Sequence, residues 1–251
     1  MSLELQRIHK DFTGSGRSLF QSLSLTLNAP ELVAVIGPSG CGKSTLLRLI
    51  AGLDQPSSGT IVRPVGERLG FVFQEPRLLP WRTVRENILL GPELKGQVVS
   101  ESTMIEVLRL VQLNPEVLRL FPHQLSGGMK MRVALVRALI LKPELLLLDE
   151  PLAALDESTR MILQEEIARI HEASGRLTLL VTHSLTEAVF LADRIVVLGR
   201  EGQLVRDFKI EFSRPRNESL RLKVEFMERV VELQRQFRGL LATDGEAHDH
   251  H

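Results

Sequence analysis

The sequence predicts an α/β fold in which a mostly parallel sheet is flanked by helices. Short apolar runs at 32–36, 145–148 and 177–181 are rich in leucine and β-branched residues, as buried strands are. Amphipathic segments of helical period follow these runs, and such alternation is typical of a parallel sheet. The remaining segments predict two additions, an antiparallel β subdomain near the N-terminus and a helical subdomain over about 77–125.

The individual elements follow from the same patterns. Apolar and polar residues alternate over 2–7 and 22–27, which predicts half-buried antiparallel strands. Thr83, with Glu86 three residues later, predicts a capping box at the start of a helix. The other predicted elements are strands at 60–62, 69–73, 195–198 and 203–205, and helices at 45–51, 84–90, 100–120 with a break at Asn114-Pro115, 126–141, 157–173, 184–191 and 218–241.

The composition and charge exclude several classes of protein. The chain of 251 residues suffices for one α/β domain with a small subdomain. Basic and acidic residues number 31 each, so the basic footprint of nonspecific nucleic-acid binding is absent. The single cysteine, Cys41, indicates a reducing compartment. The N-terminus lacks a signal-peptide pattern, and no apolar run approaches the ~20 residues of a membrane-spanning helix.

A glycine-rich loop carries the clearest functional signal. It fits the P-loop pattern G-x-x-x-x-G-K-[ST], with a predicted strand before it and a predicted helix after it. This context aims backbone N–H groups at one point, where Lys43 can reach the outer phosphates and Ser44 can ligate Mg²⁺. A chance Gly/Ser turn is the alternative. The residues predicted to bind nucleotide are Gly37, Pro38, Ser39, Gly40, Cys41, Gly42, Lys43, Ser44 and Thr45.

Two acids end the leucine-rich strand that begins at Leu145, about a hundred residues after the P-loop. Asp149 can hold Mg²⁺ through water, and Glu150 can take a proton from an attacking water molecule. An acidic turn after a strand is the alternative interpretation. In a chain that also contains a P-loop, the pair predicts the second half of a nucleotide site.

A second anion-binding helix start is predicted at Ser126-Gly127-Gly128, which offers a hydroxyl and unobstructed backbone N–H groups. A plain serine N-cap is the alternative. Since ATP has one γ-phosphate, two phosphate sites in one chain favour a head-to-tail dimer. In that dimer Ser126 of each copy would close on the ATP of the other.

The chain resembles the nucleotide-binding subunit of an ATP-binding-cassette (ABC) transporter from about Leu3 to Arg216. The resemblance implies an ABC-type P-loop ATPase core over 1–216, ATP and Mg²⁺ as ligands, and a dimer with a second copy or a homologue. A C-terminal helix over 217–241 and a disordered tail over 242–251 would follow. The matching motifs, in the family's order, are Walker A (37–45), the Q-loop (Gln74), the signature motif (125–129), Walker B (145–150), the D-loop (154–156) and the switch histidine (His183).

The resemblance also implies roles for single residues. Phe12 would stack on adenine, although a core plug is the alternative. Gln74 would reach Mg²⁺ or water and couple the nucleotide to the helical subdomain, unless it merely caps a strand. His183 would donate to the γ-phosphate, although a core histidine is the alternative, and Asp156 would lie at the dimer seam. The catalytic set is then Glu150, His183, Gln74 and Lys43, and the metal set is Ser44, Gln74 and Asp149.

Some positions depart from the family pattern. Met129 and Met131 replace common glutamines, and Pro30 replaces a usual glycine. None of these side chains is expected to touch phosphate, so activity should survive. Cys41 lies inside the P-loop and can be alkylated or oxidised, but a small filler is the favoured interpretation. The histidines of the tail can bind metal in principle, although a solvated tail is favoured.

A narrower resemblance concerns the segment 79–84 and Arg214-Pro215-Arg216, which are similar to importer ATPases of the nitrate/sulfonate/taurine group. Core packing is the alternative role for Trp81. The resemblance implies a peripheral ATPase at the cytoplasmic face of the membrane. It would energise uptake of a small solute through a separate permease, with a solute-binding protein and without nucleic acid. An exporter or lipid-transport subunit, or a soluble ABC ATPase acting on ribosomes or DNA, is the alternative.

Overall fold

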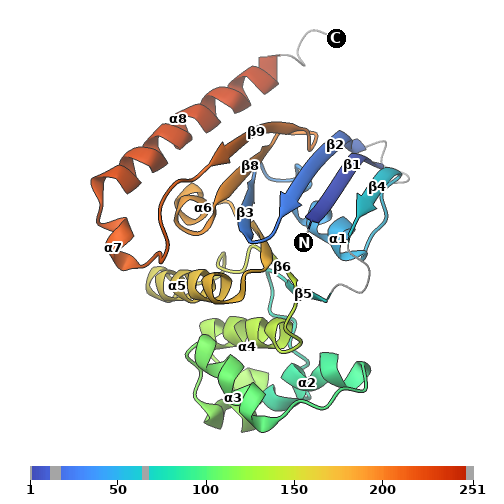
Figure 1. Cartoon of the computed structure of the whole chain (residues 1–251), viewed down its shortest axis with the longest axis vertical. Coiled ribbons are helices and arrows are strands. Elements are labelled where there is room, and N and C mark those ends of the chain that lie inside the picture. Colours follow the sequence, from blue (N-terminus) through green and yellow to red (C-terminus); the bar gives the residue numbers. More distant parts are fainter. Residues whose placement is uncertain (1, 12–17, 64–67, 247–251) are drawn as a thin grey trace.

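The computed structural model describes residues 2–11, 18–63 and 68–246 of the chain, with side chains described up to residue 238. Figure 1 shows a central sheet with its helices, a small antiparallel sheet beside it, and a group of helices below. A long C-terminal helix lies on the side of the molecule opposite that group (Figure 1). The predicted α/β class, with its antiparallel and helical additions, is confirmed.

The central sheet has the strand order β5-β6-β7-β3-β8-β9. Neighbouring strands run parallel except β8 and β9, which form an antiparallel hairpin. Every residue of β6 and β7 is buried, as expected for parallel strands covered on both faces. The strands are β3 Glu31–Ile36, β5 Leu69–Val72, β6 Leu145–Asp149, β7 Leu177–Val181, β8 Arg194–Leu198 and β9 Leu204–Lys209.

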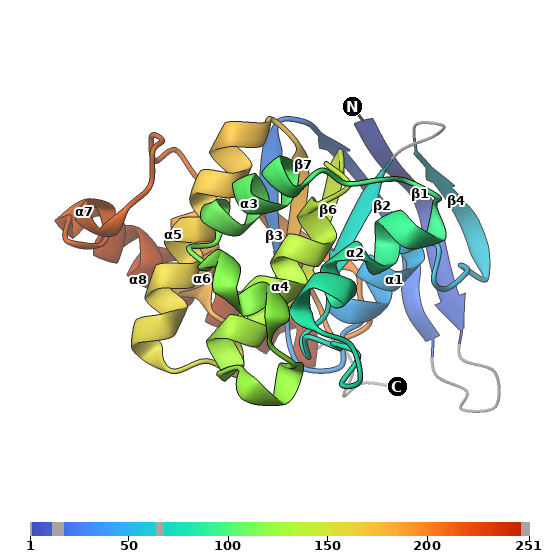
Figure 2. The same ribbon diagram turned by 90° about the horizontal axis from the view of Figure 1, so that it is seen from below.

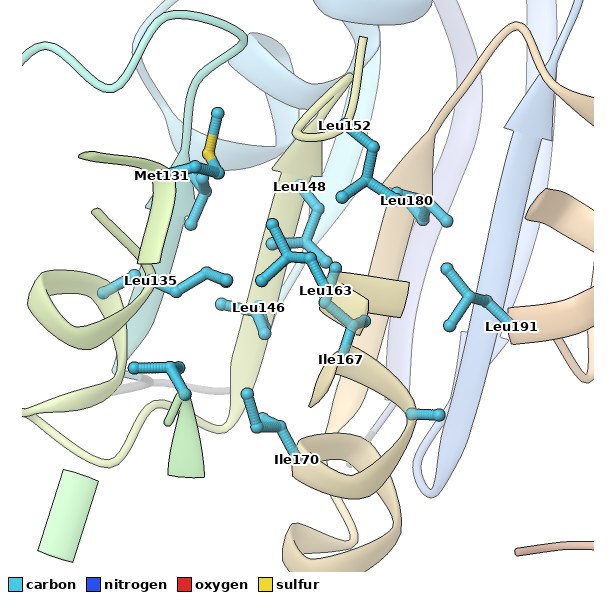
Figure 3. Close-up of a cluster of buried hydrophobic side chains, with 14 of the residues drawn as sticks. Met131, Leu135, Leu146, Leu148, Leu152, Leu163, Ile167, Ile170, Leu180 and Leu191 are labelled. Carbon is cyan, nitrogen blue, oxygen red and sulfur yellow. The ribbon is translucent and has the colours of Figure 1, made fainter. Parts of the chain in front are cut away.

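Side chains on the two faces of this sheet pack into separate cores. The helices around the sheet are α1 Lys43–Ala51, α5 Glu157–Ser174 and α6 Leu185–Leu191. Leu146 and Leu148 of β6 point to the face that carries α5 and α6 (Figure 3). Leu145 and Leu147 point to the other face, where α1 packs. The period of two in a strand therefore divides one leucine run between two cores.

The antiparallel sheet has the order β2-β1-β4. Its strands are β1 Ser2–Asp11, β2 Ser18–Asn28 and β4 Ser58–Val62. Leu3 pairs with Leu27 and Leu5 with Leu25, and all are buried in the core that contains α1. This sheet therefore covers the helix that follows the P-loop.

The helical subdomain lies below the sheet in Figure 1 and in front of it in Figure 2, and its helices α3 and α4 contact each other and α5. Its elements are α2 Val84–Leu94, α3 Glu101–Leu110, two 3₁₀ turns at Pro115–Arg119 and Pro122–Gln124, and α4 Gly127–Leu139. The capping box is confirmed, because Thr83 accepts a hydrogen bond from the Glu86 N–H while the Glu86 carboxylate accepts one from the Thr83 N–H. The interruption at Asn114-Pro115 also appears, since Asn114 caps the first 3₁₀ turn.

The C-terminal helix differs from the prediction of one helix over 218–241. It is divided into α7 Glu218–Arg221 and α8 Val224–Glu246, and α8 runs past the predicted end at 241. Both pieces contact α6, and α7 is also tied to α5. The Arg221 guanidinium of α7 lies 3.7 Å from the ring centroid of Phe190 in α6 and donates to Gln164 and Glu165 of α5. The helix α8 packs against α6.

The segment before α7 is held in place by charged side chains that are buried or partly buried. The Arg216 side chain is 1% exposed and donates to the carbonyl oxygens of Phe190, Ala192 and Phe212. The Asp193 carboxylate accepts hydrogen bonds from Arg214 and from the backbone N–H of Leu32 at the start of β3. These contacts explain structurally why two arginines flank Pro215.

Candidate active site

The P-loop connects β3 to α1 and needs glycine at particular positions. Gly40 and Gly42 have φ values of 77° and 103°, which residues with a side chain rarely adopt. A Cβ atom on Gly42 would lie 2.7 Å from Cζ of Phe20, and one on Gly37 would lie 2.6 Å from the carbonyl oxygen of Leu198. The surrounding structure therefore leaves no space for larger residues at Gly37 and Gly42.

Lys43 places its charge inside the loop. Its side chain is buried, and Nζ donates to the carbonyl oxygens of Gly37 at 3.0 Å and Pro38 at 2.9 Å. An ammonium group held among the loop's backbone groups attracts phosphate, which can take over these hydrogen bonds. The neighbouring Cys41 is also buried, and burial raises the pKa of its thiol. This environment disfavours the reactive thiolate and favours the filler interpretation of Cys41.

Ser44 and Asp149 meet beside the loop. The Ser44 hydroxyl donates to Oδ1 of Asp149 at 2.8 Å, although the two residues are far apart in sequence. Burial raises the pKa of Asp149, while the hydrogen bond from Ser44 opposes the shift. A hydroxyl and a carboxylate at this separation are oxygen donors of the kind that Mg²⁺ prefers.

Three of the predicted catalytic side chains come together at the ends of neighbouring strands. Glu150 follows β6, Gln74 follows β5 and His183 follows β7. One carboxylate oxygen of Glu150 lies 2.5 Å from Nε2 of His183, and the other accepts a hydrogen bond of 3.2 Å from Nε2 of Gln74. The carboxyl ends of adjacent parallel strands meet at one edge of a sheet, so the strand order creates this cluster.

A cavity of about 300 Å³ opens beside this cluster. Glu150 and His183 line it together with Ala153, Thr182, Ser184 and Arg160. A carboxylate that faces such a space is suited to act on a water molecule, and the histidine beside it is suited to bind an oxygen atom. Sequence reasoning did not single out Arg160, which lies in the first turn of a predicted helix.

The signature segment lies at the start of α4. Ser126 and Gly127 are exposed, and the Ser126 hydroxyl accepts a hydrogen bond from the Met129 N–H at 3.2 Å. Within a single chain Ser126 therefore acts as an ordinary N-cap, as the alternative interpretation held. Gly128 is buried, and a Cβ atom there would lie 2.6 Å from Cγ2 of Thr159 in α5.

Asp156 caps the start of α5 next to the signature segment. Its carboxylate accepts hydrogen bonds from the Thr159 N–H at 3.0 Å and from the Ser158 hydroxyl at 2.7 Å. These hydrogen bonds hold the pKa of Asp156 well below its usual range. Because Thr159 also lies against Gly128, the start of α5, which Asp156 caps, is next to the signature segment.

The predicted adenine platform, Phe12, lies outside the described residues. The other phenylalanine of this region, Phe20, is fully buried beneath the P-loop, with Gly42 and Gly202 packed against its ring. Its burial leaves no face of the ring for a base, so Phe20 does not qualify as a substitute platform.

Asn87 is a structural residue that sequence reasoning missed. It is fully buried in α2, and its side chain makes hydrogen bonds with the backbone of Leu79, Arg82 and Thr83. The loop that it holds presents Trp81, which is 72% exposed. Core packing as the role of Trp81 is therefore wrong. A polar residue on the apolar face of a capped helix was the available signal.

Comparison with known protein families shows to which family the chain belongs. The chain matches the ABC transporter family over residues 20–153. It belongs to that family and is one of its ATP-binding and ATP-hydrolysing subunits. No helix among the described residues has the length and hydrophobicity needed to cross a membrane.

Individual relatives show which members of the family this chain is similar to. The aliphatic sulfonates import ATP-binding protein SsuB 1 of Shouchella clausii is 42% identical over 245 residues, which are 98% of this chain and 95% of the relative. The nitrate import ATP-binding protein NrtC of Synechococcus elongatus is 41% identical over 90% of this chain, which spans 36% of that longer protein.

A solved structure with the same fold is the ATP-binding cassette MJ0796, in a dimeric post-hydrolysis state bound to ADP and Pi. It superposes with a TM-score of 0.75 at 29% identity, covering 84% of this chain and 100% of that chain. The predicted resemblance to ABC ATPases is thereby confirmed.

Proposed function

We propose that this ATPase energises the import of a small sulfonate- or nitrate-like solute through a separate membrane permease. The ATPase part of the proposal is carried by the convergence of Gln74, Glu150 and His183 at one edge of the sheet, and the import part is carried by the similarity to import proteins. Gln74 also begins the connection from β5 to the helical subdomain, so a change at the nucleotide can move that subdomain.

The hydrolytic roles follow from the positions of the side chains. Lys43 and the P-loop N–H groups bind the phosphates of ATP, and Glu150 accepts the proton of the attacking water. His183 donates a hydrogen bond to the terminal phosphate. Its present contact with Glu150 holds both groups within reach of the same point.

The residues present fit Mg²⁺. The Ser44 hydroxyl and the Asp149 carboxylate lie 2.8 Å apart, and the amide of Gln74, which follows the neighbouring strand β5, would supply a further oxygen. When bound, Mg²⁺ neutralises charge on the phosphates. Ser44 and Asp149 would hold it in the part of the site next to Lys43.

A dimer completes the site in this proposal. Ser126, Gly127 and Asp156 are exposed at the starts of α4 and α5, and no described hydrogen bond joins them to the P-loop of their own chain. In a head-to-tail dimer these residues meet the ATP of the other copy, and the dimeric state of the similar cassette supports such an arrangement. A second copy or a homologue can fill the partner's place.

Import of a sulfonate or nitrate is supported by the relatives, several of which are aliphatic sulfonates import proteins and one of which is a nitrate import protein. The exposed Trp81, on the loop held by Asn87, is a suitable contact for a permease. A solute-binding protein and a position at the cytoplasmic face of the membrane belong to the same proposal. An exporter or lipid-transport role is the competing one, with a soluble ABC ATPase acting on ribosomes or DNA as a more distant possibility.

The test combines transport with catalysis. Cells without this gene are expected to lose growth on an alkanesulfonate as sulfur source or on nitrate as nitrogen source. A plasmid with the wild-type gene should restore growth, and one with Glu150→Gln should not. Purified Glu150→Gln protein should bind ATP normally while hydrolysis falls by at least ~100-fold, as expected for loss of a general base. Unchanged growth on both solutes would contradict the import proposal, and near wild-type hydrolysis would contradict the role of Glu150.

A further inference from the structure

Arg160 contacts parts of the site that belong to different sequence motifs. It lies one turn into α5, just after the D-loop. Its guanidinium donates to the carbonyl oxygen of Leu155 at 2.7 Å and to that of Leu152 at 3.4 Å. It also donates to the Glu157 carboxylate at 3.0 Å. The backbone of the D-loop is therefore fixed by one planar group with several donors.

Arg160 also lies near Glu187 of α6. Its Nε, which donates to Leu152, is 3.8 Å from Oε1 of Glu187. The other carboxylate oxygen, Oε2, accepts a hydrogen bond of 2.5 Å from the Thr182 hydroxyl, and that hydroxyl in turn accepts one of 3.0 Å from the Ser184 N–H. Both neighbours of His183 are thus connected to Glu187.

Burial makes this connection energetically significant. Glu187 is 6% exposed, and burial raises its pKa while the hydrogen bond from Thr182 and the charge of Arg160 oppose the shift. A buried carboxylate is costly unless it is paired and hydrogen-bonded, so loss of Arg160 should rearrange Glu187 and the segment that it holds.

We infer that Arg160 and Glu187 are positioning residues that join the D-loop to the segment carrying the switch histidine. The connection runs from the carbonyl oxygens of Leu152 and Leu155 to the residues on either side of His183. This inference rests on the proposed roles of Glu150 and His183 and on the proposed place of the D-loop at the dimer seam. Docking of the partner on the D-loop would then set the distance between His183 and Glu150.

The competing explanation is that the ion pair only packs α6 on α5. A packing role predicts loss of stability without a specific loss of turnover, whereas a positioning role predicts lower kcat with unchanged nucleotide affinity. Neither Arg160 nor Glu187 makes a described contact with Lys43 or Ser44, so ATP binding is expected to be independent of the pair.

The experiment compares the full-length protein with three variants, Arg160→Met, Glu187→Gln and the double variant. ATP hydrolysis, ATP affinity and thermal stability are measured for each. We expect kcat to fall by ~10–100-fold, the usual cost of misplacing a catalytic group, and ATP affinity to stay within about twofold. The double variant should be no slower than the slower single variant, because both substitutions break the same connection.

A matched control is available in the same helix. Glu166 of α5 is fully buried and pairs with Arg132 at 3.1 Å, and burial raises its pKa as it does for Glu187. Glu166→Gln therefore removes a similar buried charge without a described contact to the D-loop or to residues 182–184. We expect its stability to change while kcat stays within about twofold of wild type.

Arg160→Lys keeps the charge but loses the planar fork, and it serves if Arg160→Met does not fold. If Arg160→Met folds, Arg160→Lys should hydrolyse ATP faster than Arg160→Met. If Arg160→Met does not fold, Arg160→Lys should hydrolyse ATP faster than Glu187→Gln. A lysine variant without this recovery would overturn the inference. So would a folded Arg160→Met protein with wild-type kcat, losses that multiply in the double variant, or an equal loss in the Glu166→Gln control.

Failure of the proposed function can be distinguished from failure of this inference by a separate variant. Glu150→Gln is assayed in parallel, and normal turnover in that variant would reject the catalytic assignment itself. An inactive Glu150→Gln beside a fully active Arg160→Met would reject only the connection through Arg160 and Glu187.

Discussion

At the scale of single residues, Glu150 combines an unusual backbone with a fixed side chain. Its φ is 47°, in the left-handed region that residues with a Cβ atom rarely adopt. Its N–H donates to the carbonyl oxygen of Val181, and its carboxylate is held by Gln74 and His183. Such a conformation persists when the surrounding structure fixes it, which is common at functional sites.

The backbone of Glu150 gives a prediction about stability. Glycine adopts φ of 47° without strain, so Glu150→Gly should be more stable than Glu150→Ala by about 1 kcal/mol. Both variants lack the carboxylate and should be inactive, which separates the backbone effect from the chemical one. Urea unfolding of the two proteins measures the difference. Equal stabilities, or a more stable alanine variant, would show that the backbone is not strained at this position.

Phe12 gives a prediction about ATP affinity. If it is the adenine platform, Phe12→Ala should weaken ATP binding by ~1–3 kcal/mol, the usual value of one stacked base, and Phe12→Trp should retain affinity. Equilibrium binding of ATP and of inorganic triphosphate provides the check. Phe12→Ala should weaken ATP only, because triphosphate has no base. Equal losses for both ligands would place the effect at the phosphates instead.

At the scale of elements, the segment between β9 and α7 shows how charge fixes a connection. Burial alone would raise the pKa of Asp193, but hydrogen bonds from His171 and the Leu32 N–H and the charge of Arg214 lower it to about 2. Arg216 lies deeper, and burial lowers its pKa to about 10. The side chain of Asp193 is 31% exposed, so solvent screens part of this interaction.

The lowered pKa of Asp193 predicts how stability depends on pH. Because the pKa of the folded state lies below the ordinary value of 3.8, the stabilisation is complete above about pH 4 and is lost as the pH falls towards 2. After allowance for screening, we expect about 1–2 kcal/mol. Denaturant unfolding of wild type and Asp193→Asn from pH 7 down to pH 2.5 should give a difference that shrinks with acid. A difference that is constant over this range would contradict the assigned shift.

At the scale of the whole molecule, the motifs of the site lie on separate elements of the chain. The P-loop and the ends of β5, β6 and β7 form one part, while Ser126 at the start of α4 forms the other. The helix α4 contacts α5 and, within the helical subdomain, α2 and α3 (Figure 2). A single chain therefore has the signature segment and the P-loop on different elements, which favours a site completed by a second chain.

Crosslinking tests that arrangement. Ser126 and Ser39 are both exposed, so each can be replaced by cysteine in a Cys41→Ser background that also carries Glu150→Gln. With ATP, Ser126→Cys of one chain should form a disulfide with Ser39→Cys of the other, and little should form without nucleotide. The products are separated by mass on a non-reducing gel. A disulfide found only within one chain, or none with ATP present, would overturn the head-to-tail dimer.

The sequence by itself determined the features that depend on neighbouring residues. Gly40 and Gly42 with Lys43, the capping box of Thr83, and the leucine run of β6 are local patterns, and the structure has the predicted loop, cap and strand there. The fold class followed because the periods of two and 3.6 reflect burial along one element.

Only the tertiary structure decided which distant side chains meet. The strand order places Gln74, Glu150 and His183 together, and the packing of α6 on α5 brings Arg160 to Glu187. It also buries Phe20, exposes Trp81 and divides the C-terminal helix. These outcomes depend on contacts between segments far apart in the chain, and the period of a single segment carries no information about the partner against which it packs.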